Sequence, residues 1–282
     1  MSHFTVMVFG ENPEEQIAKY DENIVVEEYS VGFVKSEDKL GFLQYYGETD
    51  FDSAYKKHGE LWNRNNWRLD EEGRWCEYST YNPDAKWDWY VIGGRWTGFF
   101  KVKKGHFGSV GETCVSGTPA KKGYADQLLK GAIDIEYMRN DAGKRAMERW
   151  EFVHNEIICG ESFTTFDKLR GSFTEIQDAR DAYWNQPVLI RWKRKQAENT
   201  SPIGFLSNIE DYLISKEDYI ENARRDVITP YAYVVNGEWF GRGDMGWWGV
   251  SSNESDAYDE QFNNVFQQMP DDTLVTIIDC HI

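Results

Sequence analysis

The sequence predicts an α+β fold, with a mainly antiparallel sheet that contains both terminal strands and packs against several helices. First, "HFTVMVF" (3–9) and the final "TLVTIIDCHI" (273–282) carry apolar residues at odd and even positions, which is typical of strands covered on both faces. Second, apolar residues recur at helical spacing between 141 and 158. Third, Gly93-Gly94 and Asn236-Gly237 are hairpin signals. We therefore expect a single α+β domain over 1–282, with a helical insertion at about 124–228.

The first half of the chain predicts one short helix and several strands. "NPEEQIAKY" begins a helix with Pro13 at its first position. "GRWCEYSTYNP" (73–83) is a strand that runs into a turn. "KWDWYVI" and "RWTGFFKV" flank Gly93-Gly94, which predicts a hairpin with a type I′ turn. The Gly-rich stretch 103–123 predicts a mobile loop.

The second half predicts helices followed by a hairpin. After the helix of 141–158, Ser172 and Glu175 form a capping-box pattern that opens a second helix, and Ser215 opens a third. "YAYVVNGEWF" (231–240) is a hairpin around Asn236-Gly237. Ser255 is expected to cap a last helix, which has an apolar side formed by Tyr258, Phe262 and Phe266.

The chain is acidic, with 48 Asp and Glu residues against 31 Lys and Arg and a formal net charge of −17. Binding along duplex nucleic acid needs a basic footprint, so a duplex is excluded as a partner of the whole surface. The acidity either serves solubility or forms a surface that docks on a basic partner or imitates nucleic acid.

Cysteine spacing and apolar runs indicate the compartment. The four cysteines form no CxxC pair, so neither a zinc ribbon nor a disulfide framework is predicted. No signal peptide or membrane span is predicted, because no apolar run is long enough. We expect a soluble cytoplasmic protein without membrane contact.

The stretch "KWDWYVIGGRW" (86–96) is the densest part of an aromatic-rich chain that has 12 Trp residues. Strand alternation would put Trp87 and Trp89 on one face, with Asp88 and Tyr90 on the other. This stretch is either a Trp-rich core or an aromatic wall that stacks a planar ligand. In the second case Arg95 would hold an anionic group, and Asp88 an amine or hydroxyl.

A second segment, "EWFGRGDMGWWG" (238–249), repeats Arg and Asp among glycines and tryptophans. It matches GxGxxG literally but does not follow the strand of a βαβ unit, so a dinucleotide site is not predicted. It is either a tight bend or a second part of the same pocket. The predicted ligand-binding residues are Trp87, Asp88, Trp89, Tyr90, Arg95, Arg242, Trp247 and Trp248.

The two termini supply a polar cluster. If the first strand pairs antiparallel with the last, His3 falls near His281, and Asp279 can orient one imidazole. His3, Asp279 and His281 are therefore candidate acid–base residues, and His3 and His281 candidate metal ligands. The alternative is an ordinary pair of partly buried histidines. Cys280 lacks a base on its own face, so it is not expected to be a nucleophile.

Several motifs are long and specific enough to suggest a family. "MSHFTVMVFG", "NPDAKWDWYVIGGRWTGFF", "RGDMGWWG" and "MPDDTLVTIIDCHI" resemble a family of uncharacterised proteins from tailed phages and bacterial genomes, including prophages. This resemblance implies an accessory protein that acts in the bacterial cytoplasm, where counter-defence is a common role.

Three functions remain open from the sequence. The first is binding of a planar, anionic, nucleotide-like ligand in the Trp/Arg pocket. The second is inhibition of a host defence protein through the acidic surface. The third is hydrolysis, with or without a metal, by the terminal His and Asp residues. Whether the chain is an enzyme is left open, no cofactor is assigned, and an oligomer is compatible with each function.

Overall fold

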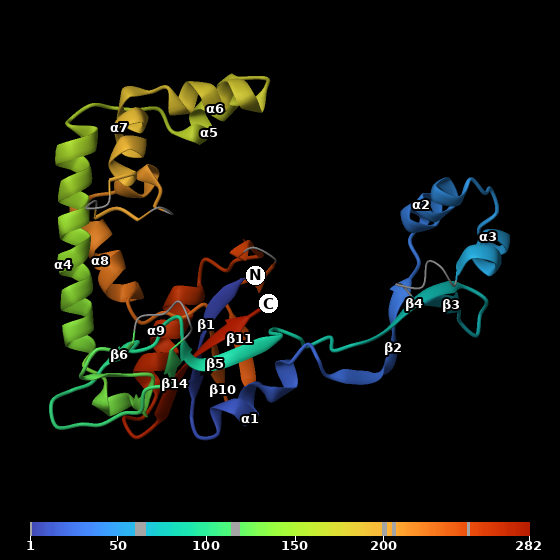
Figure 1. Ribbon diagram of the computed structural model, residues 1–282, viewed down its shortest axis with the longest axis horizontal. Coiled ribbons are helices and arrows are strands. Elements are labelled where there is room, and N and C mark those ends of the chain that lie inside the picture. The colour runs from blue at the N-terminus through green and yellow to red at the C-terminus, as the bar shows by residue number, and fades with distance from the viewer. Residues whose placement is uncertain (1, 60–65, 114–118, 199–201, 205–206, 247–248) are drawn as a thin grey trace.

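The computed structural model describes residues 2–59, 66–113, 119–198, 202–204, 207–246 and 249–282. Within these ranges the largest sheet has seven strands, six of them in the order β11-β10-β1-β14-β5-β7, with β9 also paired to β14. Most neighbours are antiparallel, and the two terminal strands lie side by side at its centre, so the α+β prediction is confirmed (Figure 1). The strands are β1 (His3–Phe9), β5 (Trp89–Gly94), β7 (Glu112–Thr113), β9 (Gln127–Leu129), β10 (Ala232–Val235), β11 (Glu238–Gly241) and β14 (Leu274–His281).

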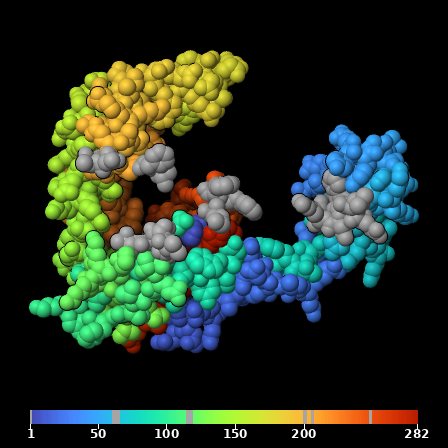
Figure 2. Space-filling view, viewed as in Figure 1, coloured from blue at the N-terminus to red at the C-terminus, as the bar shows by residue number. Residues whose placement is uncertain are grey.

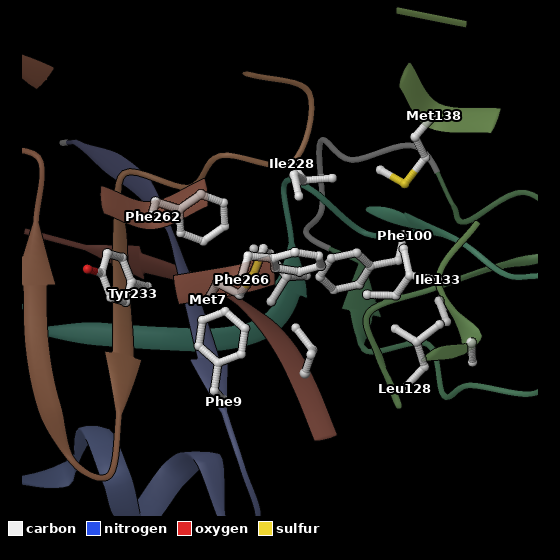
Figure 3. Packing of buried hydrophobic residues seen from close by; sticks show 14 of the residues in the cluster. Met7, Phe9, Phe100, Leu128, Ile133, Met138, Ile228, Tyr233, Phe262 and Phe266 are labelled. Carbon is white, nitrogen blue, oxygen red and sulfur yellow. The ribbon is translucent and has the colours of Figure 1, made fainter. Parts of the chain in front are cut away.

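Both faces of this sheet are covered. On one face α9 (Tyr258–Gln268) packs Phe262 and Phe266 against Met7 and Phe9 of β1 (Figure 3). On the other face α1 (Pro13–Ile17), followed by a 3-10 turn η1 (Ala18–Tyr20), contributes Ile17 to a second core. The terminal strands are apolar at odd and even positions because each face of the sheet has its own core.

Two further parts extend from the sheet (Figure 1). A helical arm is built mainly from α4 (Ile135–Val153), α5 (Phe166–Ser172), α6 (Ile176–Trp184), α7 (Pro187–Gln196) and α8 (Lys216–Asp226), with η4 (His154–Ile158), a π-helical turn, and η5 (Ile209–Tyr212). A small lobe contains β2 (Val25–Phe33), β3 (Trp67–Leu69), β4 (Trp75–Tyr81), α2 (Ser36–Tyr46) and α3 (Phe51–His58). Each has a hydrophobic cluster of its own.

The remaining elements are short. β6 (Phe100–Lys101) pairs with β8 (Tyr124–Ala125), β12 (Asp244–Met245) pairs with β13 (Ser251–Ser252), and η3 (Lys130–Ala132) precedes α4.

Figure 2 shows an open concavity between the arm and the sheet body, and Figure 1 places both chain termini on the side that faces it. Among the residues that the structure describes, no helix has the length and apolar character needed to cross a lipid bilayer.

The predicted hairpin around Gly93-Gly94 is wrong. Both glycines have positive φ, +84° and +56°, but β6 pairs with β8, and β5 pairs with β14 and β7. Steric room explains the glycines: a Cβ on Gly93 would lie 2.8 Å from Asp126 Oδ2, and a Cβ on Gly94 would overlap the Asp279 carboxyl group. The chain turns here between two buried carboxylates rather than into a neighbouring strand.

Other local predictions are confirmed. Asn236-Gly237, with φ of 52° and 76°, joins β10 to β11. Pro13 opens α1, and the Ser215 hydroxyl accepts the Asp218 N–H at the start of α8.

Two predicted helix starts are wrong. Ser172 ends α5, where its hydroxyl donates back to the Lys168 carbonyl, and α6 begins at Ile176. The Ser255 side chain does not cap α9: the N-cap is Ala257, and the Tyr258 N–H donates to the Ser255 backbone carbonyl. The Gly-rich stretch 103–123 contributes two strand contacts: Ser109 forms an isolated β-bridge with Gln127, and β7 pairs with β5 in the large sheet. Residues 114–118 of this stretch lie outside the described residues.

Candidate functional site

Two histidines lie side by side at one end of the central sheet. His3 of β1 is directly opposite His281 of β14, and Thr5 is opposite Asp279. On the other side of β14, His281 is opposite Trp89 of β5. Directly opposite residues share a sheet face, so these side chains continue the α9-facing core outward into a polar cluster. The predicted proximity of His3, Asp279 and His281 is confirmed.

Asp279 orients His3. The Nδ1 atom of His3 lies 2.8 Å from Asp279 Oδ1, and this carboxyl group is fully buried. Its second oxygen, Oδ2, accepts the backbone N–H of Arg95 at 2.9 Å. Gly94 is required next to this contact because of the Cβ overlap described above. The carboxyl group therefore has both oxygens engaged, one by the imidazole and one by the turn after β5.

A second carboxylate, Asp88, orients His281. The Asp88 Oδ1 atom lies 2.5 Å from His281 Nδ1, and the Asp88 backbone N–H donates to the His281 carbonyl. An ionised carboxylate only accepts hydrogen bonds, so both imidazoles carry their proton on Nδ1. The Nε2 atoms of both histidines are thus the ring nitrogens that no carboxylate engages.

The two imidazoles are close enough to act together. Their ring centroids are 5.0 Å apart at an interplanar angle of 73°. Nε2 of His281 is buried and makes no hydrogen bond within the described part of the chain. A buried polar atom without a partner calls for a ligand or a water molecule. Trp89 is 49% exposed, and its ring centroid lies 6.1 Å from that of His3, so it adds an aromatic surface beside the pair.

The predicted faces of residues 87 to 92 are wrong at their start. β5 begins at Trp89, and Trp87 instead bridges Asp21, so strand alternation does not reach back to it. The Trp87 ring is buried against Tyr90, at 4.9 Å, and its Nε1–H donates to the Ile17 carbonyl. Trp87 and Tyr90 therefore belong to the core on the opposite face, whereas Asp88 lies with His281.

The predicted Trp/Arg pocket is not assembled from the residues that the structure describes. Arg242 forms an ion pair with Asp259 and lies over the Tyr258 ring at 5.1 Å. Trp247 and Trp248 lie outside the described residues. Of the predicted ligand-binding residues, Asp88 and Trp89 join the histidine cluster, and the exposed Arg95 is attached to it through its backbone.

Sequence reasoning missed Asp126, which fixes the segment after β5. This fully buried carboxylate accepts the backbone N–H groups of Gly98 (2.6 Å), Phe99 (3.1 Å) and Gly111 (2.9 Å). The signal was available in "YADQLL" (124–129), where Asp126 and Gln127 interrupt an otherwise apolar stretch. Residues 93–99 are consequently held between Asp279 at one end and Asp126 at the other.

Cys280 lies in the core of the opposite sheet face, away from both imidazoles. Burial raises the pKa of its thiol, and the Asp279 carboxylate adds to the rise, so little thiolate forms near neutral pH. We expect brief iodoacetamide treatment of the native protein to modify the exposed Cys159 and spare Cys280, as peptide mapping by mass spectrometry will show. In urea both should react; equal labelling of the native protein would contradict the burial.

Within the described ranges, no group of three or more His, Cys, Asp or Glu side chains is arranged to hold a metal ion. Comparisons with protein-family models, with curated proteins and with solved structures give no match to this chain. Function therefore has to be inferred from the geometry of the site itself.

Proposed function

We propose that this protein cleaves a phosphodiester bond in a small, nucleotide-like anion by general acid–base catalysis with His3 and His281. The observation that carries the proposal is the pair of adjacent imidazoles, each with Nδ1 on a carboxylate, at 2.8 Å for His3 and 2.5 Å for His281. Such pairing fixes the tautomer and makes Nε2 the reacting nitrogen of each ring. The Nε2 atom of His281 is buried in the free protein, so the proposal requires the side chains around it to move aside when substrate binds.

The two imidazoles supply complementary proton transfers. One neutral imidazole accepts a proton at Nε2 from the attacking hydroxyl group or water as its oxygen forms a bond to phosphorus. The other, protonated, donates from Nε2 to the leaving oxygen as the old P–O bond breaks. The net result is one proton moved from nucleophile to leaving group. The Asp88 and Asp279 carboxylates stabilise each imidazolium as it forms.

The nucleophile is expected to come from water or from the substrate. Cys280 is buried on the other face of the sheet, and the Thr5 hydroxyl accepts the backbone N–H of Tyr231. Neither is positioned as a nucleophile beside a free imidazole nitrogen. A substrate hydroxyl next to the phosphate, such as a ribose 2′-OH, suits this arrangement.

Two side chains support a nucleotide-like substrate. The half-exposed Trp89 can stack a base, and the exposed Arg95, which makes no ion pair within the described part of the chain, can bind the phosphate. A net charge of −17 repels a long polyanion, so the substrate should be a cyclic mononucleotide or a short oligonucleotide. The resemblance to phage proteins supports a counter-defence role against a nucleotide signal of the host.

Chromatography of reaction mixtures tests this function. The purified protein is incubated with 2′,3′-cyclic AMP, 3′,5′-cyclic AMP, ApA and the deoxy analogue of ApA. We expect turnover of at least one, lost in the His3→Ala/His281→Ala double variant. Cleavage of ApA but not of its deoxy analogue identifies the 2′-OH as nucleophile. Failure of the protein to turn over any of the four beyond the double variant would refute the proposal.

A further inference from the structure

A separate cleft lies between the segment after β5 and the start of α4. It has a volume of about 730 Å³, within the range of small-molecule sites. In Figure 1 the lower end of α4 lies beside β6, which follows this segment in the chain. The lining side chains that matter here are Trp96, Phe99, Lys121, Tyr124, Tyr137 and Arg145.

Aromatic rings form much of the wall. Trp96 and Phe99 come from the segment after β5, Tyr124 from β8 and Tyr137 from the first turn of α4. The Nζ atom of Lys101 lies over the rings of Tyr124 and Tyr137, at 4.7 Å and 5.3 Å from their centroids. Lys101 thus holds both tyrosine rings beside one cation, and Trp96 and Phe99 add further aromatic surface on which a flat ring can stack.

Positively charged side chains lie at the same cleft. Arg145 and Lys121 line it, and Lys101, which lies over the rings of Tyr124 and Tyr137, adds a third positive charge nearby. Arg145 is paired with Asp141, one turn before it on α4, at 3.1 Å. This pair is exposed and therefore weak, so a phosphate can replace the carboxylate as the partner of Arg145.

We infer that this cleft is a binding site for a flat aromatic ring that carries an anionic group, with the size and chemistry of a nucleoside monophosphate. The ring would stack on Trp96 and Tyr137, and the phosphate would pair with Arg145 and Lys121. This site is distinct from the histidine pair and stands without the proposed hydrolysis. It uses a part of the motif "GGRWTGFF" that the histidine site does not.

Isothermal titration with AMP, a hydrolysis product rather than a phosphodiester, tests this site. We expect saturable binding by the wild-type protein and a dissociation constant raised by about tenfold or more in Arg145→Gln, since a charge-assisted contact to phosphate is lost. Lys144→Gln is the matched control, because Lys144 carries the same charge at the preceding position of α4 but does not line the cleft. It should leave the affinity unchanged. Asp141→Asn should tighten binding, because the carboxylate that competes for Arg145 is removed.

His281→Ala separates the two sites. If AMP occupies the cleft, this variant binds it as the wild type does. Three results would overturn the inference: no saturable heat with AMP, equal affinity in the Arg145→Gln and Lys144→Gln variants, or binding that is lost in His281→Ala alone. The last result would place AMP at the histidine pair and would leave the proposed hydrolysis standing.

Discussion

Replacing His281 with Ala is expected to lower kcat for phosphodiester cleavage by about 100- to 10,000-fold, the range that a general acid or base contributes. His3→Ala should have an effect of the same order, because acid and base are both needed in one turnover. The two effects should not add in the double variant, since either loss alone disables the pair. Steady-state rates on the substrate identified above measure this.

His58→Ala is the matched control for both variants. His58 ends α3 of the small lobe, and its Nε2 atom lies 3.3 Å from Glu48 Oε1, so it is also a histidine paired with a carboxylate but lies in a different part of the fold. Its kcat should equal that of the wild type. A His281→Ala protein that unfolds like the wild type and keeps full kcat would remove His281 from the chemistry.

Asp126→Asn is expected to lower the free energy of unfolding by about 2–4 kcal/mol. The carboxylate accepts three backbone N–H groups with its two oxygens. An amide has only one accepting oxygen, so its NH2 group must face at least one of these donors and leave it unpaired in a fully buried place. Urea denaturation monitored by circular dichroism measures the loss.

Asp256→Asn makes the same chemical change at an exposed position and should shift the urea midpoint little. The slope of the transition must stay the same in both variants for the comparison to hold. An Asp126→Asn protein as stable as the wild type would mean that the Gly98, Phe99 and Gly111 amides do not depend on this carboxylate.

The pairing of the termini could be predicted because the residue pattern of a strand is local, and both ends of the chain show the pattern of a strand that is covered on both faces. Once β1 and β14 pair antiparallel in the register that sets Phe9 opposite Val275, His3 and His281 are direct neighbours. The Asp88–His281 pair could not be predicted, because it joins residues 193 positions apart and depends on where β5 begins. If strand alternation is assumed to begin at Trp87 rather than at Trp89, Trp87 is assigned to the wrong face of the sheet.

The Gly93-Gly94 signal shows a different limit. The positive φ angles of both glycines are confirmed. A hairpin turn and a turn around buried carboxylates both require glycine at these positions, so the glycines alone could not tell the two apart. The cleft beside α4 was also beyond sequence reasoning, since Trp96, Tyr124 and Arg145 come from three separate elements and no local period relates them.

The segment 93–99 is anchored at both ends, with Arg95 N–H on Asp279 and Gly98 and Phe99 N–H on Asp126. Its first half borders the imidazole pair, and its second half lines the cleft. A ligand that displaces one end of this short segment is expected to strain the hydrogen bonds at the other end. Binding at the two sites is therefore expected to be thermodynamically linked. If a ligand in the cleft changes the affinity of the histidine site for substrate by some factor, substrate changes the affinity of the cleft for that ligand by the same factor. A product nucleotide held in the cleft would in this way act as a feedback signal to the histidine pair.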